Sequence, residues 1–244
     1  MGCEGADWIG APCSDALAGC GLSQQSSRPN RHERRLYEWF RGGDILVRRV
    51  VDQDAACLPG HDVHLGDGDL VLRPMREDDL AMALEWDNDP EVRHFMEAET
   101  TPLFTLEDLG DMYRGVARAA HVFVIELAGR DIGTCWLQDM NVERICRRFP
   151  GRALKRIDLS IGVKDLWGRG VGTRVIRLLT RFGLDRLGAD AIFAVGIHDF
   201  NARSLGAFRN VGFRPFEAVP TGSPGKGGTL DHVLVIERRG FRAG

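Results

Sequence analysis

The sequence predicts an α/β protein built on a mixed sheet of about seven strands, with helices on both faces. After residue 69, short strand-like runs of apolar residues alternate with segments of helical apolar periodicity, and glycine-containing turns separate them. The 244 residues are 43% hydrophobic and 27% charged, which is typical of a globular chain. The chain therefore has enough apolar surface for one sizeable core.

Three regions are expected along the chain. Residues 1–68 form an N-terminal extension that is partly disordered, because its first 30 residues are rich in Gly, Ala, Ser and Cys without a sustained period. It ends in a turn-rich linker over residues 60–68. Residues 69–238 hold the folded domain, and residues 239–244 form a C-terminal tail.

Within the domain, strands are expected at residues 69–73, 121–127, 132–138, 157–163, 191–197, 214–219 and 232–237. Helices are expected at residues 78–86, 105–119, 173–187 and 201–210. The helix at 173–187 has the clearest pattern, because Val175, Leu178, Leu179 and Phe182 share one face.

Charge and cysteine content exclude several classes of protein. The formal net charge of −3 gives no electrostatic footprint for nucleic acid. No apolar run approaches the ~18 residues of a membrane span. The six cysteines lack the paired spacing of a zinc site, which favours reduced thiols in the cytoplasm. We expect a cytoplasmic protein without a nucleic-acid or membrane partner.

Residues 157–163 alternate between apolar and polar character. The apolar positions are Ile157, Leu159, Ile161 and Val163, and the intervening positions are Asp158, Ser160 and Gly162. A carboxylate, a hydroxyl and a bare backbone are unusual on a sheet face that a helix must cover. A half-exposed strand gives the same pattern, so this segment alone leaves the question open.

A glycine-rich loop, Gly168-Arg169-Gly170-Val171-Gly172-Thr173, joins this strand to the next helix. Glycines at alternate positions let the backbone approach a ligand closely and leave N–H groups to point at it. The positive end of the helix dipole adds an attraction for anions. The succession of strand, glycine loop and helix, with Asp158 preceding the loop, therefore predicts a pyrophosphate site.

The loop resembles the acyl-CoA loop of the GNAT family, Gln/Arg-x-x-Gly-x-Gly/Ala, with Trp167 in place of the first residue. A second run, Asn201…Ser204…Phe208…Gly212-Phe213, is similar to that family's Asn-x-x-Ser/Ala-x-x-x-Tyr/Phe-x-x-x-Gly-Phe ending. The resemblance implies a mostly antiparallel sheet with a splayed central parallel pair, and acetyl-CoA as co-substrate. It implies these cofactor-binding residues: Leu159, Ser160, Ile161, Val163, Arg169, Gly170, Val171, Gly172, Thr173, Asn201, Ser204 and Phe208.

Within that superfamily the strongest likeness is to the aminoglycoside 6′-N-acetyltransferases. It runs through Leu72-Arg73-Pro74-Met75, residues 79–86 and Thr105-Leu106-Glu107-Asp108, and Ile157-Asp158 stands at that family's spacing before the loop. In those enzymes the matching Asp lies beside the amine to be acetylated, so the resemblance makes Asp158 the candidate catalytic base. A carboxylate there can hold an ammonium group and help to remove its proton.

The acceptor pocket is expected to combine aromatic and polar side chains: Trp86, Phe95, Glu97, Glu99, Trp136, Gln138, Asp139 and Asp199. Trp136 and Gln138 share a strand face and can form one wall. The alternative for most of this set is that the tryptophans are core and the carboxylates are solvated. His94 and His198 lack metal-ligand neighbours, so no metal is expected.

Two departures from that subfamily concern catalysis and the acceptor. Phe208 stands near a Tyr that in the relatives can protonate the thiolate of CoA, and we expect its ring to pack against pantetheine instead. The segment 144–156 is basic here but acidic in the relatives. It must face away from a polycationic substrate or form a mobile rim.

These features support one leading hypothesis and two alternatives. The first is a resistance enzyme that transfers the acetyl group of acetyl-CoA to the 6′-amine of an aminoglycoside, by direct attack in a ternary complex. The second is a GNAT enzyme that acetylates a protein N-terminus or another small amine. The third is a CoA-binding regulatory module without turnover, against which Asp158 argues because a binding module needs no carboxylate there.

Overall fold

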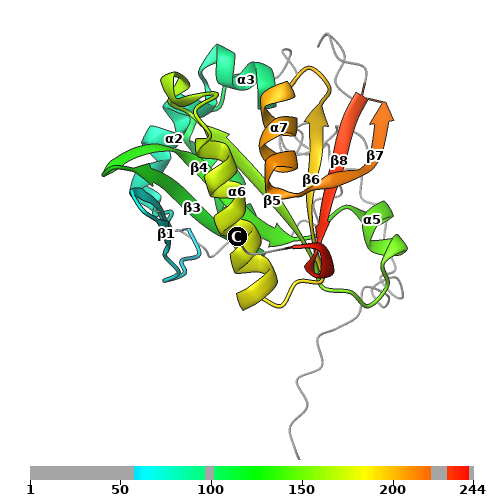
Figure 1. Ribbon diagram of the computed structural model, residues 1–244. Coiled ribbons are helices and arrows are strands. Elements are labelled where there is room, and N and C mark those ends of the chain that lie inside the picture. Colours follow the sequence, from blue (N-terminus) through cyan, green and yellow to red (C-terminus); the bar gives the residue numbers. More distant parts are fainter. Residues whose placement is uncertain (1–57, 97–101, 221–229, 242–244) are drawn as a thin grey trace, which may run out of the picture.

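A computed structural model describes residues 58–96, 102–220 and 230–241 of the chain. These residues form an eight-stranded sheet in the order β1-β2-β3-β4-β5-β6-β8-β7 (Figure 1). Only β5 and β6 pair in parallel, and the other neighbours are antiparallel. The predicted fold class is confirmed. The strands are β1 (Leu65–Asp67), β2 (Leu70–Pro74), β3 (Ala120–Leu127), β4 (Arg130–Asp139), β5 (Leu154–Ile161), β6 (Ala191–His198), β7 (Arg214–Pro220) and β8 (Leu230–Glu237).

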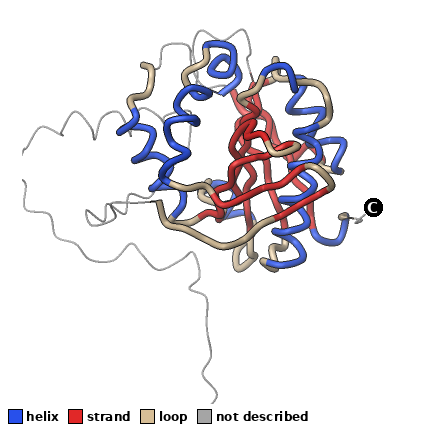
Figure 2. Tube along the Cα trace, turned by 90° about the vertical axis from the view of Figure 1, so that its left-hand side faces the viewer, coloured by secondary structure: helices blue, strands red, loops and turns tan. Residues whose placement is uncertain are grey.

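Helices lie on both sides of the sheet, and Figure 2 shows the strands between two groups of them. The α-helices are α2 (Leu80–Asp87), α3 (Pro90–Met96), α4 (Leu106–Ala117), α5 (Glu143–Arg148), α6 (Val171–Arg181) and α7 (Ala202–Val211). Short 3-10 turns are η1 (Glu77–Asp79), η2 (Lys164–Leu166) and η4 (Arg238–Gly240), and the π-helical turn η3 (Phe182–Arg186) continues α6. None of the helices in the described ranges is long and apolar enough to cross a membrane.

The main core lies between the sheet and helices α6 and α7. Helix α6 contributes Val171, Val175 and Leu179, whose spacing of four residues places them on one helix face. Leu205 and Phe208 come from α7. Burial of this face fixes α6 against the sheet and thereby places the glycine loop that precedes it.

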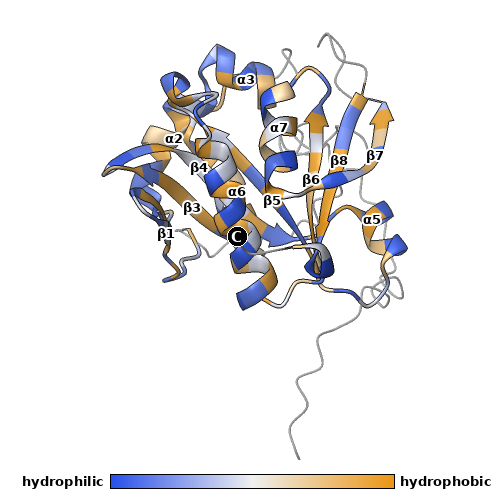
Figure 3. Ribbon diagram, in the orientation of Figure 1, coloured by the Kyte–Doolittle hydropathy of each residue, from blue (hydrophilic) through white to orange (hydrophobic). Residues whose placement is uncertain are grey.

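Two smaller cores cover the other side of the sheet. One lies under α2 and α4 and includes Leu109, Tyr113 and Val122. The other lies under α5 and includes Ile145 and Phe193. Strands β6 and β8 are largely apolar in Figure 3, as expected for strands with covered faces.

One strand and two α-helices were not predicted. Strand β1 lies within the stretch that the sequence analysis interpreted as a linker. It forms because a two-residue turn at Gly68 (φ +63°) reverses the chain and lets β1 pair with β2. Helix α3 begins at Pro90, a residue suited to the first turn of a helix. Helix α5, of only six residues, lies between β4 and β5.

Two element boundaries also differ from the prediction. Strand β5 begins at Leu154 rather than residue 157, because Leu154–Arg156 pair with β6, and Lys155 and Arg156 pair with β4 as well. It ends at Ile161, where the amides of Gly162 and Val163 turn to the carbonyl of Ile132. Helix α6 starts two residues before the expected position 173, at Val171.

The parallel pair at the centre of the sheet opens along its length. Strands β5 and β6 pair only where Leu154–Arg156 face Ala191–Phe193. Beyond that point β6 has an irregular register with β8 between Ala194 and Ile197, and Gly196 there has φ +75°. The second half of β5 therefore separates from β6, and the sheet carries a cleft at its centre.

Candidate active site

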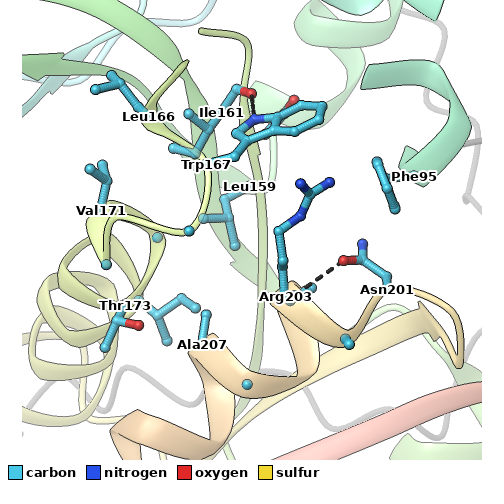
Figure 4. A pocket seen from close by; sticks show the side chains of 18 of the residues that line it. Phe95, Leu159, Ile161, Leu166, Trp167, Val171, Thr173, Asn201, Arg203 and Ala207 are labelled. Atoms are coloured by element: carbon cyan, nitrogen blue, oxygen red, sulfur yellow. Dashed lines mark hydrogen bonds between the residues drawn. The ribbon is translucent and has the colours of Figure 1, made fainter. Parts of the chain in front are cut away.

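The cleft lies where β5, the glycine loop and α7 meet, and α3 closes one side (Figure 4). Its volume is about 340 Å³. It is lined by Val92, Phe95, Met96, Leu159, Ser160, Ile161, Leu166, Trp167, Gly168, Gly170, Val171, Gly172, Thr173, Ile176, Asn201, Ala202, Arg203, Ser204, Gly206, Ala207 and Asn210. All of the predicted cofactor residues except Val163, Arg169 and Phe208 are in this set.

The glycine loop is built for a backbone conformation that other residues adopt at a cost. Gly168 and Gly170 have φ +76° and +79°, and Gly170 is the N-cap of α6. A Cβ at either position meets nothing within 4 Å, so the requirement for glycine is conformational rather than steric. The first amides of α6 lack intrahelical partners and can bind an anion at the cleft.

Helix α7 forms the opposite wall. The side-chain oxygen of Asn201 accepts a hydrogen bond from the Ser204 amide at 3.1 Å and so caps the helix (Figure 4). Asn201 thus has a structural role at the cleft in addition to the cofactor contact that its motif predicts.

The three predicted cofactor residues outside the cleft have different environments. Val163 packs against the main core, and the Arg169 side chain is exposed. Phe208 is 2% exposed and packs edge-on against Phe213, with ring centroids 5.0 Å apart. Helical spacing places Phe208 on the same face as Leu205, which contacts the core, so the structure does not bring its ring to the place expected for pantetheine.

Asp158 is held in a bidentate ion pair by the nearly buried Arg156, two residues before it on the same strand face. The distances are 2.9 Å from Arg156 Nε to Oδ2 and 2.5 Å from Nη2 to Oδ1. Gln138 Nε2 also donates to Oδ2, at 3.1 Å, and Asn141 Oδ1 accepts from Arg156 Nη1. Asp158 does not line the cleft. By strand alternation its side chain leaves β5 on the face opposite Leu159 and Ile161.

The remaining cations of the basic segment are also paired. The partners are Arg144 and Arg148 with Glu217, Arg147 with Glu143, Arg152 with Glu237, and Lys155 with Asp139. None of these residues lines the cleft. That the segment faces away from the substrate or forms a mobile rim stays a prediction. Its charges are compensated locally.

Comparison with protein families identifies the domain. A model described as an acetyltransferase (GNAT) domain matches residues 69–214. The chain belongs to the GNAT acetyltransferase family. Strand β5, the glycine loop, α6, β6 and α7 all lie inside the matched range.

Solved GNAT structures share this fold at low identity. The aminoglycoside acetyltransferase AAC(6')-Ib in complex with ribostamycin and coenzyme A is 21% identical, with a TM-score of 0.58, over 70% of this chain and 95% of that one. A GNAT acetyltransferase from Bacillus anthracis is 15% identical, with a TM-score of 0.58, covering 72% and 99%. Mycobacterium smegmatis RimJ in complex with CoA-disulfide is 18% identical, with a TM-score of 0.57, covering 69% and 81%.

Some of the predicted acceptor residues of this GNAT domain lie near Asp158. Trp136 is its direct partner in the β4–β5 register, and Gln138 donates to it. The indole Nε1 of Trp136 is buried without a hydrogen-bond partner among the described residues. Phe95 instead lines the cleft from α3.

The other predicted acceptor residues are dispersed. Trp86 lies over Gly162, where a Cβ would come within 2.1 Å of the indole Cγ, so that glycine makes room for a side chain rather than for a ligand. Asp139 is exposed and pairs with Lys155. Asp199 follows β6 and is half-buried. Glu97 and Glu99 lie outside the described residues.

Two features, one in the cleft and one in the core beside it, were not predicted from the sequence. Arg203 lines the cleft, and the only signal for it is its place between Asn201 and Ser204 in the second motif. A buried polar chain also runs behind β4: Tyr113 Oη donates to Asp87 Oδ2 at 3.3 Å and shares a 2.9 Å hydrogen bond with Thr134 Oγ1. Burial raises the pKa of the Asp87 carboxyl to about 7.

Proposed function

We propose that this GNAT enzyme transfers the acetyl group of acetyl-CoA to a primary amine, the 6′-amine of an aminoglycoside. The observation that carries the cofactor assignment is the cleft itself, with the opened edge of β5 on one side and the left-handed glycines and first amides of α6 on the other. Pantetheine fits along an unpaired strand edge, and pyrophosphate fits a helix N-terminus. The AAC(6')-Ib complexes with coenzyme A and ribostamycin or kanamycin support this choice of both substrates.

Asp158 receives the amine in this proposal. A carboxylate can accept about four hydrogen bonds, and Arg156 and Gln138 supply three. One position remains for the amine, and the fixed carboxylate orients it toward the thioester. The proton leaves through Asp158 or through a water beside it, and the amine lone pair then forms the new amide bond as the C–S bond to CoA breaks.

Trp136 and Gln138 form the wall beside that amine. The buried indole Nε1 of Trp136 is a donor available to an oxygen of the acceptor. Backbone amides at the end of β5, near Ser160 and Ile161, stabilise the oxyanion of the tetrahedral intermediate.

A second candidate is acetylation of a peptide N-terminus or another small amine. It is favoured by the charge balance around Asp158, since Arg156 compensates this carboxylate and Lys155 compensates Asp139. A polycationic drug gains less from compensated carboxylates than from free ones.

Thiol release from acetyl-CoA separates the two candidates. The enzyme is assayed with kanamycin, tobramycin and a panel of peptides, and its expression in a susceptible bacterium is tested against drugs with a 6′-amine or a 6′-hydroxyl. Turnover and protection confined to 6′-amino drugs support the proposal. Turnover with peptides and none with any 6′-amino drug would replace it by the second candidate.

A further inference from the structure

Arg203 is the single charged residue among the described residues that line the cleft. It lies in the first turn of α7, on the wall that faces the glycine loop, and Figure 4 shows its side chain extending across the cleft toward Trp167. Every other residue of the lining is uncharged. An anion that enters the cleft therefore meets one cation and no carboxylate from its walls.

Two aromatic rings hold the guanidinium in this position. Its central carbon lies 4.2 Å from the ring centroid of Trp167 and 4.6 Å from that of Phe95. The two rings also meet edge to face, with centroids 5.7 Å apart, and Trp167 is fixed because its Nε1 donates to the Ile161 carbonyl at 2.7 Å. Aromatic contacts of this kind attract the charge of a guanidinium without using its N–H donors.

The donors of Arg203 are uncommitted within the described part of the chain. No hydrogen bond or ion pair to another described residue involves its side chain. Two other cations of this half of the chain are committed to ion pairs: Arg174 pairs with Asp67 and Asp69, and Lys164 pairs with Asp89 and Glu91. A planar guanidinium with free donors suits bidentate binding of a phosphate.

We propose that Arg203 binds a phosphate group of acetyl-CoA and, with Trp167, makes the enzyme select the nucleotide-bearing form of the acetyl donor. This inference rests on the proposed use of acetyl-CoA. The α6 amides and Arg203 approach the cofactor from opposite walls of the cleft. The phosphate on Arg203 is either part of the pyrophosphate or the 3′-phosphate of the adenosine.

The test compares Arg203→Gln with the parent protein on three donors. Calorimetry gives the Kd for acetyl-CoA and for 3′-dephospho-acetyl-CoA, and NMR titration gives it for acetyl-pantetheine, which has no phosphate. Loss of charge-assisted hydrogen bonds should weaken acetyl-CoA binding by about tenfold or more and leave acetyl-pantetheine unchanged. Arg203→Lys, which keeps the charge but loses the planar fork, should fall between the two proteins.

The two nucleotide donors identify the phosphate. A loss with acetyl-CoA alone assigns the 3′-phosphate, and an equal loss with both nucleotides assigns the pyrophosphate. Arg209→Gln is the matched control, because Arg209 is an exposed arginine of the same helix and does not line the cleft.

Two results would overturn the inference: unchanged acetyl-CoA binding by Arg203→Gln, or an equal loss with all three donors. If the parent protein itself fails to bind acetyl-CoA, the proposed function falls, and the inference falls with it. The parent measurement thus separates the two failures.

Discussion

Arg156 and Asp158 form a bidentate ion pair along one strand, with side chains 9% and 19% exposed. The desolvation cost of such a pair is offset only when geometry and additional hydrogen bonds are good, and here Gln138 and Asn141 provide those bonds. The pair fixes the carboxylate orientation and lowers the net charge of the site. The expected base is therefore an oriented carboxylate rather than an isolated negative charge.

Two substitutions separate these roles. Asp158→Asn should reduce turnover by roughly 10²-fold or more, because it removes the proposed acceptor of the amine proton, while acetyl-CoA binding stays intact. Arg156→Gln should lower kcat without changing the KM for acetyl-CoA, since it frees the carboxylate from its orientation. Lys155→Gln is the control, because Lys155 pairs with the exposed Asp139. Steady-state kinetics measures kcat and KM for each variant. Full activity of Asp158→Asn would show that Asp158 has no catalytic role.

Two substitutions of Gly170 in the glycine loop separate the effect of backbone strain on stability from the effect of charge on acetyl-CoA binding. Gly170→Ala should destabilise the fold by roughly 1–2 kcal/mol, because a Cβ is costly at φ +79°. Gly170→Asp should in addition abolish acetyl-CoA binding, because its carboxylate repels the phosphates. Gly129→Asp in the β3–β4 turn is a matched control, with φ +77° and open space around the Cβ. Calorimetry should show normal affinity for that variant, and undiminished affinity of Gly170→Asp would contradict the loop assignment.

The buried carboxyl of Asp87 should make stability depend on pH. Its pKa is raised from 3.8 to about 7, chiefly by burial. Between these values the folded state holds a proton that the unfolded state has lost, so the free energy of unfolding falls as pH rises through this window. The difference corresponds to roughly 4 kcal/mol as an order of magnitude.

Asp87→Asn should therefore flatten the decline of stability between about pH 4 and pH 7. Denaturant titrations across that range measure it. Asp89→Asn is a useful control, because Lys164 lowers the pKa of Asp89 and that variant should not flatten the decline. A parent protein without any decline in this window would show that Asp87 is not a buried acid.

Local patterns predicted the parts of the fold whose cause is local. The apolar stripe of α6, the alternation of β5 and the glycines between them are visible in consecutive residues, and the structure places them together at the cleft. Strand β1 was missed because three residues show no period, and its pairing with β2 forms it. Helix α5, of six residues, is too short for its periodicity to stand out.

The same distinction between local and long-range causes decides which site residues the sequence could predict. The ion pair of Arg156 and Asp158 could have been predicted from the sequence, since residues two apart on a strand share a face. The chain of Asp87, Tyr113 and Thr134 was not, because its members are 26 and 21 positions apart and meet only after the sheet forms. Arg203 lies within the second motif, whose other residues were predicted to bind the cofactor. Its own contacts with Phe95 and Trp167 could not be predicted, because they depend on how α3 and α7 approach the loop.

Phe208 provides the last prediction, and its position changes what a substitution there tests. The ring is buried in the main core against Phe213 and does not line the cleft. Phe208→Tyr would bring a hydroxyl into this apolar environment. Burying a hydroxyl without a partner costs roughly 1–3 kcal/mol, so the melting temperature should fall by several degrees.

The turnover of the folded Phe208→Tyr enzyme should stay within a few-fold of the parent value, because the new hydroxyl does not reach the departing thiolate. Phe208→Leu serves as the companion variant: it removes the ring and also destabilises, through a cavity rather than a buried polar group. Both variants should bind acetyl-CoA normally after correction for the folded fraction. A gain of a hundredfold in turnover for Phe208→Tyr would instead show that a phenol at this position supplies a missing acid, and that the natural protein is a weak catalyst built mainly to bind its cofactor.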